Sequence, residues 1–229
     1  MEIAFIADIH SNMEGLKAVL AELEAKKIKT VYCLGDLVGY GPDPNRVIEA
    51  IRNRKIPCIM GNHDWAVMTG ETRWFNQYAA EAIDWNREKT SEENRAFLAS
   101  LKEKLVFKEG GKKILLVHGS PKRPLFDYVY PERSKRELES FFAEEEVDII
   151  CVGHSHVPFV YVKDGKIFIN AGSVGQPRDG DKRASYAVLD TKTWEAEIRR
   201  VAYDPTPTKE KIFKAGLPKF LGERLALGL

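Results

Sequence analysis

The five histidines of this 229-residue chain lie in short polar segments, and each segment comes directly after an apolar run. Imidazole, carboxylate and amide groups are all ligands for divalent transition metals. A segment containing Gly35 and Asp36 adds a further carboxylate in the same setting. We therefore predict one metal site built from the segments Asp8-Ile9-His10, Gly35-Asp36, Gly61-Asn62-His63-Asp64, His118-Gly119 and Gly153-His154-Ser155-His156.

The apolar runs before these segments are predicted β-strands. In open α/β sheets, ligands bind in the crevice outside the carboxyl ends of the strands. Any one of the polar segments alone would be weak evidence, because such histidines are usually hydrogen-bonded loop residues. Five such segments, each at the end of a predicted strand, are together strong evidence for a metal site. The strands are predicted at Ile3–Ala7, Thr30–Leu34, Ile56–Met60, Lys113–Val117 and Asp148–Val152.

Helices are predicted between the strands of the first half. Asn12 has the side chain of a helix N-cap, and Leu16, Val19, Leu20 and Leu23 follow it at helical spacing. A second helix carries Val47, Ile48 and Ile51. The stretch from Trp65 to Leu101 is predicted to be helical, with a capping box at Thr90-x-x-Glu93. Strands that alternate with helices predict parallel pairing.

The second half is predicted to form β-hairpins, with one helix at about Arg133–Phe142. The hairpins pair Leu105–Glu109 with Lys113–Val117, Val157–Val162 with Lys166–Asn170, and Ser185–Leu189 with Trp194–Val201. A helical tail at about 204–229 is interrupted by Gly216 and Pro218. The length favours one domain, residues 1–229, with this tail as part of it.

Composition excludes several classes of protein. A net charge of +1 provides no strong nucleic-acid signal, and no apolar run approaches the roughly 20 residues of a membrane span. The sequence starts with a strand pattern and has no signal-peptide layout. Cys33, Cys58 and Cys151 are isolated within or beside apolar runs, which is typical of reduced cysteines. We expect a cytoplasmic protein.

The five polar segments, in this order, resemble the calcineurin-like metallophosphoesterase superfamily. The resemblance extends from Asp8 to about Leu189. The run from Asn170 to Arg178 and the barely interrupted frame are similar to its small bacterial and archaeal phosphodiesterase branch. The resemblance implies an α/β fold, an αββα sandwich of two mixed β-sheets flanked by helices, with two divalent metal ions at the carboxyl edge.

The resemblance also implies a role for each site residue. Asp8, His10 and His156 would bind one metal, whereas Asn62, His118 and His154 would bind the other. Asp36 would bridge the two ions. Nitrogen and oxygen ligands without a thiolate suit Mn, Fe, Ni, Co or Zn and do not choose among them.

Four further residues are assigned around the metals. His63 would act as general acid or electrostatic stabiliser, and Asp64 would hydrogen-bond its other ring nitrogen. Arg178 and Asn12 would contact substrate, although Arg178 could form an ion pair elsewhere and Asn12 could serve only as the N-cap. The loop 120–131, with Arg123, Phe126 and Tyr128 and also Lys122 and Tyr130, could form a wall for an aromatic or nucleotide-like group, or pack as an ordinary loop.

We therefore expect a dinuclear metal-dependent phosphohydrolase that acts on phosphodiesters, with a metal-bridging hydroxide attacking phosphorus in line. The alternatives are a phosphomonoesterase, a nucleotide polyphosphate hydrolase on the same site, and a non-catalytic scaffold of the same fold. The substrate would be a small-molecule phosphoester. A homodimer is also open, because the apolar tail residues Phe213, Leu217, Phe220 and Leu221 could cover the core or a partner.

Overall fold

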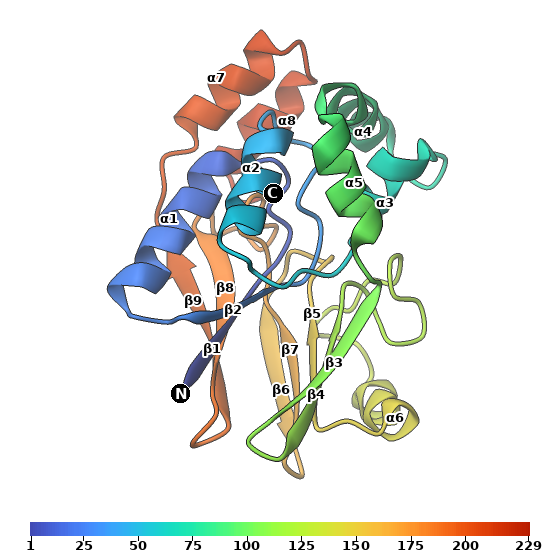
Figure 1. The fold of residues 1–229 in the computed structure, drawn as a ribbon, viewed down its shortest axis with the longest axis vertical. Helices are drawn as coiled ribbons and strands as arrows, with labels where there is room; N and C mark the ends of the chain where they lie inside the picture. Colours follow the sequence, from blue (N-terminus) through green and yellow to red (C-terminus); the bar gives the residue numbers. More distant parts are fainter.

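The computed structural model describes all 229 residues and shows two mixed β-sheets packed face to face, with helices outside them (Figure 1). The first sheet has the order β2-β1-β8-β9, and the second has the order β3-β4-β5-β7-β6. The first contains β1 (Glu2–Ile6), β2 (Thr30–Cys33), β8 (Ala184–Asp190) and β9 (Glu195–Val201). The second contains β3 (Lys104–Glu109), β4 (Lys112–Val117), β5 (Ile149–Val152), β6 (Phe159–Lys163) and β7 (Lys166–Asn170).

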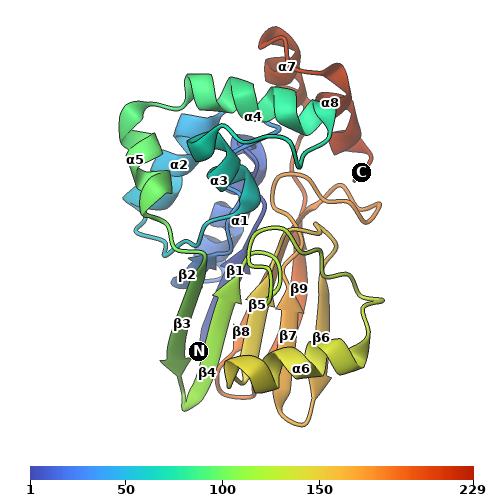
Figure 2. The same ribbon diagram turned by 90° about the vertical axis from the view of Figure 1, so that its right-hand side faces the viewer.

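The helices cover the outer faces of the sheets and one end of the sandwich (Figures 1 and 2). None of them is long and apolar enough to cross a membrane. They are α1 (Met13–Ala25), α2 (Pro44–Asn53), α3 (Asn62–Thr69), α4 (Gln77–Lys89), α5 (Glu92–Ser100), α6 (Lys135–Glu145), α7 (Thr206–Lys214) and α8 (Lys219–Glu223), followed by a 3₁₀ turn at Arg224–Ala226.

Strand β1 shows how the sequence produces the layers. Successive side chains of a strand point to opposite faces. Ile3 and Phe5 therefore pack between the two sheets, whereas Ala4 and Ile6 pack against α1 and α2. Both faces are buried, which explains the unbroken apolar run. On the far side, Phe141 of α6 packs against the second sheet. The layers are helix, sheet, sheet and helix, as predicted.

The pairing of the strands follows the predicted pattern. Strand β1 pairs in parallel with β2, and β4 pairs in parallel with β5. The three predicted hairpins are the antiparallel pairs β3–β4, β6–β7 and β8–β9. The two glycines of the β3–β4 turn, Gly110 and Gly111, have positive φ, which suits residues without a side chain.

Two local predictions are wrong. The stretch Ile56–Met60 makes only isolated bridges, Cys33 with Cys58 and Ile59 with Lys102, and Pro57 in its middle has no N–H to donate to a ladder. Helix α5 is capped by Ser91, whose side chain accepts the Asn94 N–H. Thr90 instead donates to the Asn86 carbonyl at the end of α4.

Candidate metal centre

The seven predicted metal ligands meet at one end of the sandwich. Strand β1 leads to Asp8, β2 to Asp36, β4 to His118, and β5 to His154 and His156. Asn62 is the first residue of α3. The side chains of all seven, the set Asp8, His10, Asp36, Asn62, His118, His154 and His156, are at most 4% exposed.

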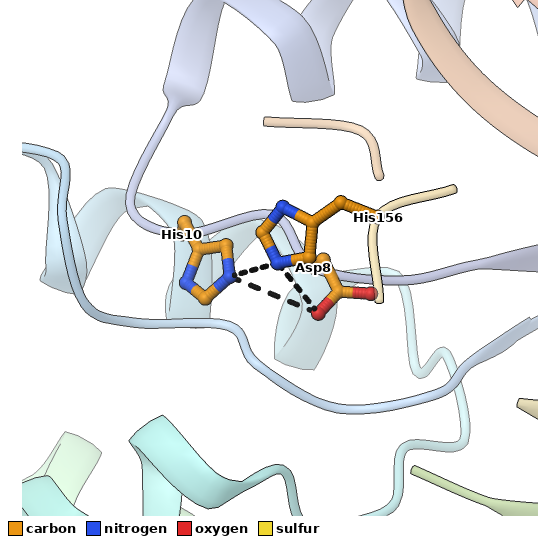
Figure 3. A group of neighbouring side chains, drawn as sticks. All are labelled: Asp8, His10 and His156. Carbon is orange, nitrogen blue, oxygen red and sulfur yellow. Dashed lines mark hydrogen bonds and ion pairs between the residues drawn. The ribbon is translucent and has the colours of Figure 1, made fainter. Parts of the chain in front are cut away.

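The imidazoles converge on the two carboxylates. The His156 Nε2 atom lies 3.3 Å from Asp8 Oδ1, and the His118 Nε2 atom lies 3.3 Å from Asp36 Oδ2. His10 lies between them, with Nε2 3.7 Å from Asp8 Oδ1 and 3.6 Å from Asp36 Oδ2. Figure 3 shows Asp8, His10 and His156 pointing toward one another.

Main-chain carbonyls fix the orientation of three of these rings. The Nδ1 atoms of His10, His118 and His156 lie 2.9, 2.8 and 2.5 Å from the carbonyl oxygens of Val38, Leu34 and Gln176, respectively. A carbonyl only accepts, so each Nδ1 carries the proton. The Nε2 atoms then face the centre as the ligand atoms, as in metal sites whose outer contacts set the tautomer.

The donor atoms fit divalent cations. Two groups, Asp8 with His10 and His156, and Asp36 with His118 and His154, each place their ligand atoms within 4.8 Å of one another. Asp8 Oδ1 and His154 Nε2 are buried without a hydrogen-bond partner. The Nε2 atoms of His10 and His156 are 3.1 Å apart, although both protons are used on the other ring nitrogens. A cation among these lone pairs would satisfy them.

Asn62 and His63, at the start of α3, lie beside the two groups of potential ligands. Asn62 Oδ1 lies 3.0 Å from His118 Nε2, beside the second group. His63 forms a third potential metal-binding group with His10 and Asp36. His63 was not predicted to be a metal ligand. The main-chain N–H of His63 donates to Asp36 Oδ1 at 2.8 Å, so α3 is attached directly to the proposed bridging carboxylate.

Five of the seven predicted ligands have left-handed backbone conformations. Asp8, His10, Asp36, His154 and His156 have φ between +49° and +64°. Such φ values are unfavourable for residues with a side chain and cost of order 1–3 kcal/mol each. The chain thus reverses sharply after each strand, which turns the side chains back over the strand end. No feature of the sequence indicated this strain.

Burial sets the charge state of most of the imidazoles. It lowers the pKa of His10, His154 and His156 well below the ordinary value, so these rings are neutral and could bind a cation. Burial also raises the pKa of Asp8 to about 7, with a contribution from the neighbouring Asp36. His118 differs, because the carboxylates of Asp36 and Asp8 outweigh its burial and raise its pKa to about 10. The carboxylates thus attract one positive charge to this point.

The predicted hydrogen bond between Asp64 and His63 is absent. The Asp64 carboxylate instead accepts the main-chain N–H groups of Asp36, Leu37, Val38 and Gly61. The first turn of α3 aims this carboxylate at the loop after β2 and away from the adjacent ring. Asp64 therefore holds the loop that carries Asp36, rather than the tautomer of His63.

The ring of His63 is held in place by packing against neighbouring rings. Its ring centroid lies 4.7 Å from that of His10, 4.5 Å from Tyr40 and 4.9 Å from Phe75. Its Nδ1 atom is buried without a partner. A side chain at Gly39 would place a Cβ 2.2 Å from this Nδ1, so the glycine is needed for the close approach.

Asn12 and Arg178, the two residues predicted to contact substrate, differ in their contacts. Asn12 caps α1, and its amide also bonds the Gly175 carbonyl, Tyr203 and Thr208. Both N–H groups and the oxygen are in use, so the predicted substrate contact by Asn12 is not supported. Arg178 lies over the Tyr40 ring at 5.5 Å, and its charge adds to burial, the largest cause, in lowering the pKa of His10, His63 and His156. Its guanidinium donates hydrogen bonds only to Gln176 Oε1, so the predicted substrate contact by Arg178 stays a prediction.

A pocket of about 580 Å³ opens beside the centre and includes Asn62 and His154 in its wall. Arg123, Phe126 and Tyr128 of the loop 120–131 line it as proposed, whereas Lys122 pairs with Glu144 outside it. Tyr40, from the loop after β2, also lines it. The rest of the wall was not predicted from the sequence and consists of Trp65, Trp74, Phe75, Asn76 and Ala79. The aromatic pair Trp74-Phe75 in a loop was the available signal.

Known proteins match this chain over its whole length. It is 43% identical over 245 aligned positions to an uncharacterized protein of Methanocaldococcus jannaschii, with 99% of this chain and 98% of the relative covered. The crystal structure of a metallophosphoesterase from Sphaerobacter thermophilus is similar with a TM-score of 0.85 at 34% identity, covering 100% and 99% of the two chains. A hypothetical protein from Pyrococcus horikoshii reaches a TM-score of 0.92 at 25% identity, covering 100% and 98%.

The family model places these likenesses in one superfamily. Residues 1–194 match the model described as the calcineurin-like phosphoesterase superfamily domain. That range contains all seven clustered residues together with His63 and Arg178. The chain therefore belongs to the calcineurin-like phosphoesterase superfamily.

Proposed function

We propose that this chain is a dinuclear metal-dependent phosphohydrolase that acts on phosphodiesters. The observation that carries the proposal is the pair of ligand groups, one around Asp8 and one around Asp36, that share a single buried centre. Asp8, His10 and His156 would hold one ion, and Asn62, His118 and His154 the other. Asp36, which faces His10 on one side and His118 on the other, would bridge them.

Two bound divalent cations would supply positive charge to stabilise the attacking and leaving oxygens of an in-line displacement. The chain's own residues would position the ester. Arg178 would bind a phosphoryl oxygen through its planar guanidinium. His63 would donate to the leaving group or to a phosphoryl oxygen. Neither role requires movement of the buried ligand loops.

Space beside the centre, rather than its charge, favours a diester. Two M²⁺ ions with the Asp8 and Asp36 carboxylates leave a net charge of about +2, which accepts a diester monoanion or a monoester dianion. A diester differs by its second organic group, which needs room beside the reacting phosphorus. The pocket next to Asn62 and His154 offers about 580 Å³ for it.

Two further features support two wider parts of the proposal: that the tail belongs to one domain with the rest of the chain, and that the protein is cytoplasmic. Leu217, Leu221 and Leu225 of the tail pack with Tyr40, so the tail supports the loop beside His63. All three cysteines are unpaired, as in proteins of reducing compartments.

Metal removal tests the function. The chain is stripped with chelator, reloaded with Mn²⁺, Fe²⁺, Ni²⁺, Co²⁺ or Zn²⁺, and assayed on diesters, monoesters and dinucleoside polyphosphates. We expect two metals per chain, with Mn²⁺ among the activators and diesters as the fastest substrates. Full activity in excess chelator with no bound metal would disprove the metal-dependent mechanism. Faster turnover of monoesters or polyphosphates would select those alternatives.

His63→Gln separates enzyme from scaffold. The amide keeps the polarity and approximate reach of the ring, so both metals and the fold should be retained. Turnover should fall 10²–10⁴-fold, the contribution typical of one general acid, and the loss should be greatest for poor leaving groups. Loss of metal in step with activity would make His63 a ligand. Equal inertness of both proteins, each with two metals, would favour the scaffold.

A further inference from the structure

We propose that the pocket beside Asn62 and His154 binds the base of a nucleoside phosphoester, which makes nucleotides the substrate class. We call it the base pocket, defined by Tyr40, Asn62, Trp65, Trp74, Phe75, Asn76, Ala79, Arg123, Phe126, Tyr128 and His154. The inference rests on the proposed function for the chemistry of the ester, but the pocket can be tested by binding alone.

The base pocket is continuous with the metal centre. Its wall includes Asn62 and His154, and the Tyr128 ring stacks on His154 with centroids 3.8 Å apart and planes 20° apart. Phe75, on the other side, contacts the His63 ring edge-on. A group that fills the pocket is therefore within one ester linkage of the position where the phosphorus would react.

The walls present aromatic faces from separate parts of the chain. Trp65 comes from α3, Trp74 from the loop before α4, and Phe126 from the loop after β4. Trp65 and Phe126 meet edge-on at 5.3 Å. Every nucleobase has a π-face that stacks on such side chains, and the volume is within the usual range for small-molecule sites.

Three of these aromatic residues lie outside the hydrophobic core. Trp74 is 71% exposed and Tyr128 is 45% exposed. Neither they nor Phe126 belongs to any of the four hydrophobic clusters of the core. Apolar surface gathered in one concave place is typical of a binding site. The fold alone gives no reason for Trp74 to be there.

Two polar groups distinguish a base from a purely apolar guest. The Arg123 side chain makes no hydrogen bond or ion pair, although it lines the pocket. Asn76 uses its Oδ1 to accept the Ala79 N–H, which leaves its amide N–H groups free. A base offers ring nitrogens and carbonyl oxygens around its edge to such donors. An alkyl chain would leave both donors unmatched.

Paired ligands isolate the contribution of the base. The full chain, loaded with Mn²⁺, is titrated with adenosine 5′-monophosphate and with ribose 5-phosphate, which lacks only the base. Binding is followed by calorimetry and by tryptophan fluorescence, since two of the four tryptophans line the pocket. We expect the nucleotide to bind at least about tenfold more tightly, the size of one base–aromatic stack, and to quench the fluorescence.

Variants locate the effect. Trp74→Ala and Phe126→Ala should each weaken nucleotide binding about tenfold and leave ribose 5-phosphate binding unchanged. Tyr78→Ala is the matched control, because Tyr78 is 47% exposed on the first turn of α4 and lies outside the pocket. Unfolding temperatures should be unchanged for Trp74→Ala, which confirms that the fold is intact.

The possible outcomes keep the two proposals distinct. Equal affinity for the two ligands, or a parallel loss of both in Trp74→Ala, would overturn the base pocket even if diesters are hydrolysed. Base-dependent binding that maps to Trp74 and Phe126 would support it even if no ester is cleaved, and in that case the hydrolase proposal alone would fall.

Discussion

The metal centre and the base pocket share Asn62 and His154, but they are built in opposite ways. In the centre, Asp8 and His118 are fully buried, and main-chain carbonyls hold three of the imidazoles from behind. In the pocket, Trp74 is 71% exposed and the Arg123 side chain has no partner. The centre is enclosed and held by the main chain, whereas part of the pocket wall is open to solvent.

This difference fits the two tasks. Electrostatic stabilisation of a reacting phosphorus requires groups fixed in advance, and strand ends packed in a core provide that rigidity. Recognition of a flat organic group needs only contact area and a few donors. Loops can supply both with little effect on the fold. We therefore expect substitutions in the centre to change metal binding and turnover, and substitutions in the pocket to change affinity alone.

Asp36→Ala should have the largest effect. It removes the carboxylate that lies nearer to both His10 and His118, at 3.6 and 3.3 Å, so two cations would no longer be shielded from each other. Activity should fall more than the 10–100-fold typical of residues outside the ligand shell, and metal analysis should find one ion or none. Asp84→Ala, an exposed acid on α4, should change neither. Two tightly bound metals in Asp36→Ala would refute the bridging role.

Asp64→Asn tests the rigid side of the comparison. The amide presents N–H groups to main-chain donors that now bond a carboxylate. Leaving buried donors unsatisfied costs about 1–3 kcal/mol each, so we expect a loss of about 2–4 kcal/mol. Calorimetry should show this as a melting temperature lowered by roughly 5–15 °C. A shift below about 2 °C, matching that of Asp84→Asn, would mean that the loop does not depend on Asp64.

Gly39→Ala tests whether the shape around His63 matters. Its φ of +92° and the close approach of His63 Nδ1 both oppose a Cβ. Gly180→Ala is the control, since Gly180 has φ of +80° but no neighbour within 4 Å. Gly180→Ala should lose about 1–2 kcal/mol of stability from its φ alone, and Gly39→Ala should lose at least as much. Turnover should fall only in Gly39→Ala, by about 10²-fold, as for a displaced catalytic group. Equal turnover in the two variants would show that His63 tolerates displacement.

Lys211→Met should have the smallest effect, because it loosens only the tail. Lys211 Nζ donates to Glu14 and Asp43 at 2.8 and 2.6 Å. Although burial opposes it, the hydrogen bonds from Lys211 and Thr208 lower the pKa of Glu14 below its ordinary value of 4.5. A lowered carboxyl pKa stabilises the fold above the unfolded value, and the gain is lost as the pH falls through the folded value.

The variant should therefore be less stable than wild type by up to about 1 kcal/mol at pH 7. Urea unfolding should show this difference shrinking below about pH 4.5. Lys214→Met, an exposed lysine without an ion pair on the same helix, should match wild type at every pH. A difference that stays constant down to pH 3 would show that the ion pair is not its source.

The sequence predicted that these seven side chains come together, because six of them follow a strand that is recognisable by itself. Once Ala7, Leu34 and Val117 end buried strands, the positions of Asp8, Asp36 and His118 follow from the topology. The role of Asp64 could not be predicted, because its partners are main-chain N–H groups. Every residue except proline carries such a group, so the sequence does not indicate which N–H groups bond Asp64.

The fold was predictable for a similar reason, and its errors are local. Alternating strands and helices fixed the layers, whereas Ile56–Met60 has a strand composition but only isolated bridges. The base pocket was predictable only in part. Phe126 and Tyr128 belong to a loop that follows a ligand, but Trp74 reaches the pocket through the packing of α3 and α4. Neither helix indicates that contact in its sequence.

The left-handed backbone at five ligands has a consequence for how this protein can vary. At Asp8, His10, Asp36, His154 and His156, glycine would relieve the backbone strain while removing a side chain that is proposed to bind metal. These are positions where a gain in folding stability would remove function. A screen for thermostable variants, run without an activity selection, should therefore enrich glycine at these positions. Such enrichment would locate the centre from folding stability alone.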